Sequence, residues 1–236
     1  MKTIRISVLI FLALGAAQAD SFNVTLNTAP LIGHAAGPFS LAFEFADGTG
    51  TGDGNNLVVL SDFTFGAGGP SGSPLMFGSV GGDLSSSLVM TDASPDSVFV
   101  QSFVPGNTLG FHLEITTNVD DGGIPDAFIM SILDNTFRPI PTTALSPLSP
   151  FLEIDIDSSN PTVTTYASDT GRSPVGGGGP IDLGTPTVQS AVPEPGTLIL
   201  LGTALLGLCL RRPRHWQGQG MNSRILRQDD PSPSQE

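Results

Sequence analysis

The sequence predicts an all-β fold, an antiparallel β-sandwich of the jelly-roll type with about nine strands. Three observations lead to this prediction. Short segments alternate apolar and polar residues with a period of two, which is typical of strands with one buried face. Clusters of glycine, proline, aspartate and asparagine separate these segments, as expected for turns. No window in the body of the chain sustains the 3.6-residue apolar period of an amphipathic helix.

The chain begins with a segment that predicts a secretory signal peptide. Lys2 and Arg5 form a positively charged start, residues 6–17 are mostly apolar, and Ala17-Gln18-Ala19 is a small-x-small cleavage motif. We therefore expect signal peptidase to remove residues 1–19 by cleaving after Ala19, and the remaining chain to be exported through the inner membrane.

A β-sandwich domain is expected over residues 20–167. Four strands alternate cleanly, at residues 21–27, 38–45, 108–115 and 151–157. Five are less regular, at residues 56–65, 84–91, 97–103, 126–133 and 162–166. In the second of the clean strands Phe43 lies on the face that we expect to point inward, and Glu44 lies on the opposite face.

After Tyr166 the alternation stops, so residues 168–191 are expected to be a linker. This segment contains four consecutive glycines at 176–179 and prolines at 174, 180 and 186. A flexible chain of about 25 residues reaches roughly 25–30 Å. Such a linker would hold the domain away from a membrane and expose the segment that follows.

Residues 192–214 combine three features in a fixed order. Val192 leads into Pro193-Glu194-Pro195, where the two prolines favour extended backbone. Residues 196–210 carry no charge, and a helix of that length would span ~22 Å of a hydrocarbon core that is about 30 Å thick. Arg211, Arg212 and Arg214 follow and favour the cytoplasmic side. The sequence therefore predicts a short transmembrane helix over residues 196–210.

This arrangement resembles the PEP-CTERM sorting signal of Gram-negative bacteria. The resemblance implies recognition by the membrane protease-transpeptidase exosortase and cleavage near the Pro-Glu-Pro. The implied signal residues are Val192, Pro193, Glu194, Pro195, Arg211, Arg212 and Arg214. The protein would be anchored in the inner membrane until cleavage and would then reach the cell surface or the extracellular space. The family usually ends soon after the basic cluster, whereas here a polar segment follows, residues 215–236, which we expect to be disordered.

The body of the chain, from Phe22 to about Tyr166, also resembles a family of small PEP-CTERM proteins of unknown function. The resemblance lies in the opening F-N-V-T-L-N-T, the strand P-F-S-L-A-F-E-F, the turn G-S-V-G-G-D-L and the late segments F-L-E-I-D-I and V-T-T-Y. It implies a matrix or surface protein without known catalysis.

The composition of the body excludes several classes of function. Residues 20–192 contain 18 acidic and two basic residues, which gives a net charge of −16. Nucleic acid is therefore excluded as a partner, because phosphate binding needs a basic surface. The body has no lysine and no cysteine, since Cys209 lies in the apolar segment. Amine and thiol nucleophiles and disulfide bonds are thus absent from it.

No catalytic motif is present, and we expect no enzymatic activity. Neither His34 nor His112 belongs to a motif with the spacing of metal ligands, and no Gly-x-Ser-x-Gly segment occurs. One alternative stays open. Glu153, Asp155 and Asp157 share a strand face, and two carboxyls flanking a cleft are what a glycosidase needs. Against this alternative, the body lacks tryptophan and has a single tyrosine, Tyr166, for stacking on a sugar.

Calcium is the one metal for which the sequence offers candidate ligands, and no other cofactor is expected. Carboxylate and amide oxygens on flexible turns are typical calcium ligands. Two Gly-rich loops supply them, through Asp47, Asp53, Asn55, Asp120, Asp121 and Asp126. Neither loop matches an EF-hand or a Gly-Gly-x-Gly-x-Asp repeat, and aspartates that merely form turns are the simpler interpretation.

The sequence therefore predicts an exported, exosortase-sorted surface or extracellular-matrix protein with a structural or interaction role. Its expected partners are signal peptidase, exosortase and the extracellular polysaccharide of the matrix. The alternative function is that of a carbohydrate-binding or carbohydrate-cleaving jelly-roll domain, with calcium as a candidate cofactor.

Overall fold

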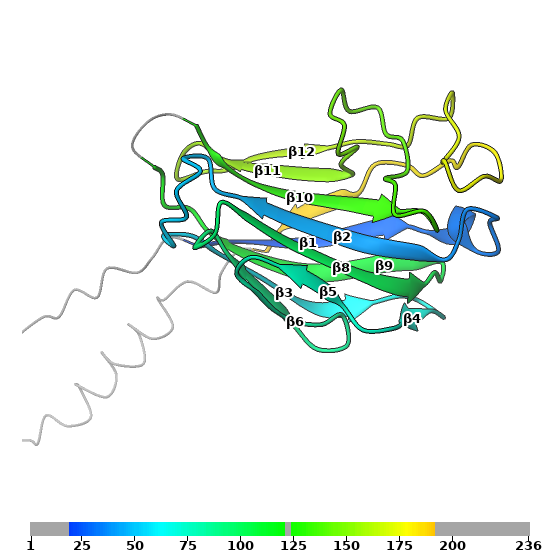
Figure 1. Ribbon diagram of the computed structural model, residues 1–236, viewed down its shortest axis with the longest axis horizontal. Helices are drawn as coiled ribbons and strands as arrows, with labels where there is room; N and C mark the ends of the chain where they lie inside the picture. Colours follow the sequence, from blue (N-terminus) through cyan, green and yellow to red (C-terminus); the bar gives the residue numbers. More distant parts are fainter. Residues whose placement is uncertain (1–18, 121–123, 192–236) are drawn as a thin grey trace, which may run out of the picture. The chain divides into compact units, whose positions relative to one another are not determined.

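A computed structural model describes residues 19–120 and 124–191 of the chain. These residues form two antiparallel β-sheets packed face to face (Figure 1). The described residues contain 13 strands and one short 3-10 helix, η1 (Ala29–Leu31). The predicted all-β class with two antiparallel sheets is confirmed, and the jelly-roll type stays a prediction.

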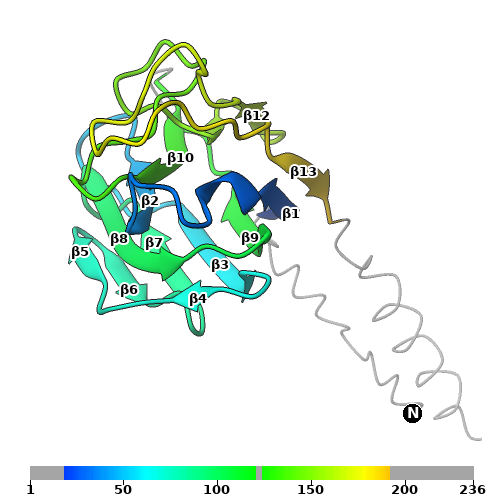
Figure 2. The ribbon, with the colours of Figure 1, turned by 90° about the vertical axis from the view of Figure 1, so that its right-hand side faces the viewer.

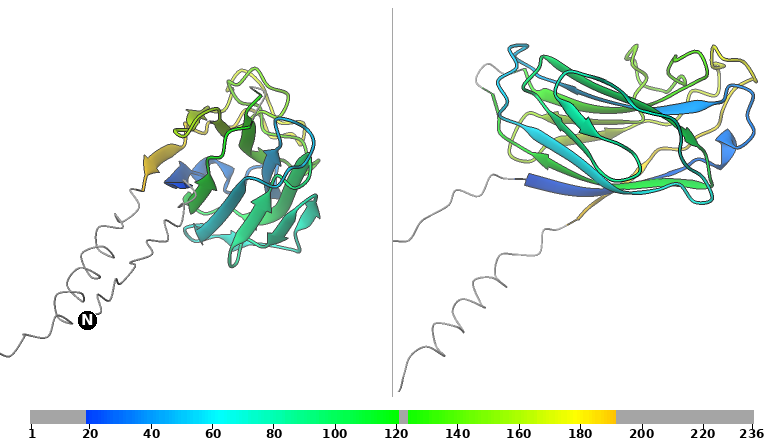
Figure 3. Two further views of the ribbon diagram at one scale, coloured as in Figure 1. Left: turned by 90° about the vertical axis from the view of Figure 1, so that its left-hand side faces the viewer. Right: turned by 60° about the horizontal axis from the view of Figure 1, so that its bottom comes forward.

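The first sheet has the strand order β13-β1-β9-β3-β7-β6. Its strands are β13 (Thr187–Ser190), β1 (Ala19–Asn27), β9 (Thr108–Thr116), β3 (Leu57–Thr64), β7 (Leu88–Thr91) and β6 (Val80–Gly82). The second sheet has the order β12-β11-β10-β2-β8-β4, and β5 also pairs with β8. Its strands are β12 (Thr162–Thr165), β11 (Leu152–Ile156), β10 (Asp126–Leu133), β2 (Phe39–Ala46), β8 (Asp96–Val104), β4 (Gly69–Pro70) and β5 (Leu75–Phe77). Figure 3 shows the two layers from two further sides.

Each of the nine expected strands is present in the structure. The least accurate boundary is that of β7, which begins at Leu88 rather than at Leu84. The unexpected strands β4, β5, β6 and β13 are two to four residues long. Strands this short contain too few residues for a period of two to be recognised, so their pairing depends on longer neighbours.

Phenylalanine side chains form the centre of the core between the two sheets. Phe43 on β2 has no exposed surface. Its ring stacks on Phe128 of the neighbouring strand at 5.9 Å between centroids. Across the sandwich it meets the edge of Phe111, which lies on β9 of the other sheet, at 5.7 Å. The inward face predicted for the β2 segment is therefore confirmed.

Replacement of Phe43 by alanine is expected to lower the free energy of unfolding by about 3–5 kcal/mol, because it leaves a cavity between the sheets. Chemical denaturation monitored by circular dichroism measures this change. The matched control is Glu114→Gln on the exposed face of β9, which should change stability by less than about 0.5 kcal/mol. Equal losses for the two variants would contradict the central position of Phe43.

The C-terminal part of the domain corrects one prediction, since residues 168–191 are folded against the sandwich and do not form a free linker. Ile181 and Leu183 are buried in the core. The Ser168 hydroxyl donates to the Ile181 carbonyl at 2.7 Å, and the Leu183 amide donates to the Ser168 hydroxyl at 2.7 Å. Strand β13 then runs antiparallel to β1 (Figure 2). The folded domain thus extends to Ala191.

Two contacts explain how a segment rich in glycine is fixed. Asp134, in the turn after β10, accepts a hydrogen bond from the Gly176 amide at 2.6 Å. Gly178 has a φ of +88°, and a Cβ at this position would lie 2.6 Å from the His34 ring. The glycines therefore permit close approach and left-handed backbone here, where the composition had suggested flexibility.

Among the described residues no helix is long and apolar enough to cross a membrane. The expected transmembrane helix at residues 196–210, the polar segment 215–236 and residues 1–18 of the expected signal peptide lie outside the described residues. Ala19 is described, and it pairs with Thr116 at the start of β1.

The variant Leu183→Ala tests the attachment of this segment. Because Leu183 is 1 % exposed and belongs to the core, its truncation should cost about 2–5 kcal/mol of unfolding free energy. Val175→Ala is the control in the same segment, since Val175 is 73 % exposed and should be almost neutral. If both variants unfold like the wild-type protein, the segment is a linker after all.

Candidate metal centre and sorting signal

Acidic side chains gather at one end of the sandwich, close to the ends of four strands. Asp47 directly follows β2, Asp92 directly follows β7, Asp120 follows β9, and Asp126 is the first residue of β10. Strands β2 and β10 are paired, with Ala46 opposite Ala127. This antiparallel register places Asp47 and Asp126 at the same edge of the second sheet.

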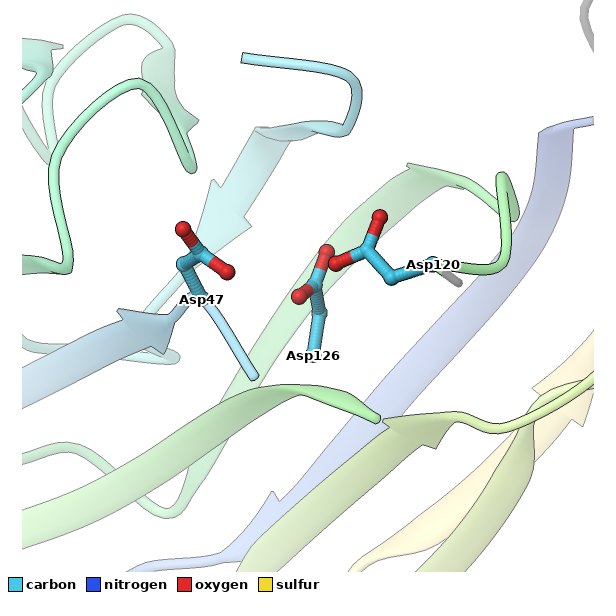
Figure 4. A group of neighbouring side chains, drawn as sticks. All are labelled: Asp47, Asp120 and Asp126. Carbon is cyan, nitrogen blue, oxygen red and sulfur yellow. The ribbon is translucent and has the colours of Figure 1, made fainter. Parts of the chain in front are cut away.

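Three of these carboxylates converge. Asp47, Asp120 and Asp126 each offer one oxygen, and these oxygens lie within 4.8 Å of one another. Figure 4 shows the carboxylates of Asp120 and Asp126 facing each other, with Asp47 on the other side of Asp126. Asp126 is 2 % exposed and Asp47 is 6 % exposed. In the described part of the chain no arginine forms an ion pair with them, so the cluster has no protein countercharge.

The loop that follows β2 is wrapped around Asp47. Its carboxylate accepts hydrogen bonds from the Thr49 amide at 2.7 Å, the Thr49 hydroxyl at 2.8 Å and the amides of Gly50 and Gly52. Burial by itself would raise the pKa of Asp47, but these donors outweigh it and hold the pKa below its usual value. Asp47 is therefore ionised, and the glycines, with positive φ at 50 and 52, let the loop turn around it.

Asn56 connects the cluster to the first sheet. Its backbone amide donates to both carboxylate oxygens of Asp92, at 3.1 and 2.9 Å. Its side-chain amide donates to Asp126 at 2.8 Å and to the Asn118 carbonyl at 2.7 Å. Burial, helped by the nearby Asp126 carboxylate and opposed by the Asn56 amide, raises the pKa of Asp92 to about 7.

The sequence-predicted calcium ligands divide into three groups. Asp47, Asp120 and Asp126 come together, and Asn55 joins them because its side-chain amide donates to Asp120. Asp53 lies on the exposed rim, where it accepts a hydrogen bond from the Asn55 amide at 3.2 Å. Asp121 lies outside the described residues.

Sequence reasoning missed Asn56 and Asp92 as members of the cluster. A signal for both existed, because Asn56 is the first residue of the predicted strand 56–65 and Asp92 directly follows the predicted strand 84–91. What was missing was the strand pairing that brings these ends together.

The cluster is open to solvent on one side. A pocket of about 490 Å³ adjoins the cluster at Asp120 and is lined by Thr49, Thr51, Asp53, Asn55, Val119 and Asp120. Burial together with the carboxylates of Asp126, Asp53 and Asp47 raises the pKa of Asp120, although the Asn55 amide opposes this. A small cation thus has a route to a site of concentrated negative charge.

The other polar candidates form local contacts. His112 lies on the outer face of β9, hydrogen-bonded to Ser21 and Asn23 at 3.0 Å each and 3.5 Å from Glu114. Glu153 accepts a hydrogen bond from the Tyr166 hydroxyl at 3.1 Å. Burial and the carboxylates of Glu153 and Asp157 raise the pKa of Asp155, which fits an outward acidic face on β11 without a basic partner.

Comparison with known proteins bears on the other end of the chain. Residues 191–213 match the family model described as the PEP-CTERM protein-sorting motif. The chain carries a PEP-CTERM sorting signal. The matched range contains the Pro-Glu-Pro and Arg211 and Arg212, and Arg214 follows directly after it. Such a signal marks a protein that is exported, processed by exosortase and sorted to the cell surface or the extracellular space.

No curated protein and no solved structure gave a significant match to this chain. The resemblance of the body to a family of small PEP-CTERM proteins is thus unsupported by these comparisons.

The buried Asp92 carboxyl makes stability depend on pH. The pKa of Asp92 is about 7 in the folded protein and about 3.9 in an unfolded chain. At pH values between these two, Asp92 is protonated in the folded state and ionised in the unfolded state. Stability therefore falls as pH rises from about 4 to about 7. In a buffer with a chelator, the melting temperature should drop by several degrees between pH 5 and pH 8. For a domain of this size each kcal/mol of lost unfolding free energy lowers the melting temperature by roughly 2–4 °C.

Asp92→Asn should remove most of this drop, because an amide does not titrate. Asp83→Asn, in the exposed turn between β6 and β7, is the control and should retain it. Melting curves of the three proteins at both pH values provide the measurement. A full drop in Asp92→Asn would show that another group is responsible.

Proposed function

We propose that this protein is a structural or interaction component of the cell surface or of the extracellular polysaccharide matrix, delivered there through exosortase. The observation that carries the proposal is the sorting signal at residues 191–213, joined to a folded, acidic β-sandwich. An acidic surface without cysteine or lysine suits a soluble extracellular domain that associates with divalent cations or cationic partners.

The boundary between fold and signal supports this delivery route. The Ala191 amide donates to the Ser21 carbonyl at 2.7 Å, and Ala191 is the last residue that the structure describes. The same residue is the first of the matched signal. All buried core residues of the described part precede it. Cleavage near Pro193-Glu194-Pro195 would therefore leave the domain complete.

Anchoring before cleavage follows from the apolar segment and the arginines. Residues 196–210 are long enough to insert into a bilayer but short for a lasting span. Arg211, Arg212 and Arg214 would remain on the cytoplasmic side. The protein is then held with its domain facing outward until exosortase acts.

Replacement of Pro193, Glu194 and Pro195 by alanines tests the route. The apolar segment and the arginines remain, so the chain should still reach the membrane, and the unprocessed form should accumulate there instead of the shorter product. Cell fractionation with an immunoblot against the β-sandwich measures both forms. Pro231→Ala is the control outside the matched signal and should be processed normally. Processing of the triple variant at the wild-type level would contradict the proposal.

One observation favours a second candidate function, carbohydrate binding or cleavage. The outer face of the second sheet has a groove of about 310 Å³ whose lining includes Glu44, Arg138 and Phe137. Phe137 is 60 % exposed, and an aromatic ring beside charged groups is a common arrangement in sugar sites. A glycan and polysaccharide binding screen on the processed protein decides between the two candidates, with Phe137→Ala as the matched variant. Binding that this variant loses would favour the sugar-binding function.

A further inference from the structure

We propose that the carboxylate cluster at the end of the sandwich is a calcium site, with Asp47, Asp120, Asp126 and the side-chain oxygen of Asn55 as its protein ligands. This inference does not depend on the sorting signal or on exosortase, because every ligand lies in the folded domain. It concerns what holds the loops of that domain together once the protein is outside the cell.

The spacing of the carboxylates fits an ion of this size. Calcium binds oxygen at roughly 2.3–2.6 Å, so two ligands on opposite sides of one ion lie about 4.6–5.2 Å apart. Oxygens from Asp47, Asp120 and Asp126 lie within 4.8 Å of one another. A single ion placed among these oxygens would therefore lie close to coordinating distance from all three carboxylates.

Unpartnered oxygens point to a ligand independently of the charges. Three buried side-chain oxygens in the described part of the chain lack a hydrogen-bond partner, and two of them are Asn55 Oδ1 and Asp120 Oδ2. Buried acceptors are nearly always paired with a donor or an ion. Two orphan oxygens on neighbouring side chains of one cluster are explained together by a bound cation.

The hydrogen bonds around the two orphan oxygens indicate why no protein donor serves them. The Asn55 side-chain nitrogen donates to Asp120 Oδ1 and, at 3.1 Å, to Asp53. Asn55 therefore gives both of its donors to carboxylates and keeps its oxygen free. Asp120 uses one oxygen for Asn55 and keeps the other free. The pair is oriented to offer two acceptors, which is the requirement of a cation and not of an anion.

The donor set selects the type of metal. All ligands are carboxylate or amide oxygens, without a histidine or cysteine in the cluster, which disfavours zinc and copper. The ligands come from loops, and the pocket of about 490 Å³ on the open side leaves room for water. Calcium accepts oxygen ligands in a flexible geometry at roughly 2.3–2.6 Å, whereas magnesium demands a near-ideal octahedron at about 2.0–2.1 Å.

Calcium in this position would join three parts of the fold. Asp47 belongs to the loop after β2, Asp120 to the segment after β9, and Asp126 to the start of β10. The first and last lie on the second sheet and Asp120 extends from the first, so the ion would clamp the two sheets at this end. Extracellular modules commonly bind calcium in the range of about 10⁻⁴ to 10⁻³ M, which suits a surface protein.

The test uses the processed protein purified after export and stripped with a chelator. Its melting temperature should rise by several degrees with millimolar calcium chloride, and increasingly with concentration, because the ion binds the folded state alone. Sodium chloride at the same ionic strength only screens charge and should have a smaller effect. Isothermal titration calorimetry with calcium should show one binding site per chain.

Variants link the binding to the cluster. Asp120→Asn keeps the shape of the side chain and its acceptor for Asn55 but loses the charge, so the calcium Kd should rise at least tenfold. Asn55→Ala should also weaken binding. Asp83→Asn, at a half-buried aspartate in the turn between β6 and β7, is the matched control outside the cluster and should bind like the wild-type protein. Equal shifts with calcium and sodium, or unchanged affinity in Asp120→Asn, would overturn the proposal.

Discussion

The register of β2 against β10 is the constraint on which the rest of this structure depends. It places Phe45 opposite Phe128 and Phe43 opposite Met130 in the core, and the same pairing brings Asp47 and Asp126 together at the end of the sheet. A slip of one residue would turn every phenylalanine of β2 toward solvent. Core packing therefore also fixes the position of the acidic cluster. The pairing of β2 with β10 produces both the hydrophobic core and the candidate metal site.

The charge of the domain leaves its acidic end with few neutralising groups. Two basic residues oppose 18 acidic ones in residues 20–192, and in the described part the one ion pair joins His112 and Glu114 on an outer face. Buried carboxylates are instead satisfied by amides and hydroxyls, as at Asp47, or take up a proton, as the raised pKa of Asp92 indicates. The divalent cation proposed above would supply positive charge that the described residues do not place beside this cluster.

The attachment of residues 168–191 changes how the sorting signal is presented. Strand β13 lies at the edge of the first sheet beside β1, and the matched signal begins at the residue that directly follows this strand. The matched signal therefore starts where a folded strand ends, and residues 168–191 do not form a flexible spacer before it.

The sequence by itself determined the class of the fold, the nine longer strands, the inward face of β2 and the sorting signal. The fold class, the strands and the face follow from period-two alternation, and the signal follows from a short motif of consecutive residues. Tertiary structure alone decided the rest. The short strand β13 pairs with Phe22–Thr25, more than 160 residues earlier in the chain. Ile181 and Leu183 are buried in the core, although the isolated segment Ile-Asp-Leu shows no recognisable period. Asp47, Asp120 and Asp126 were among the six predicted candidate ligands. Strand pairing across the two sheets decided which of the six converge, and it also brought Asn56 and Asp92 to the cluster. Local propensity acts between neighbours in the chain, whereas a metal site is made by residues that only the packed sheets bring together.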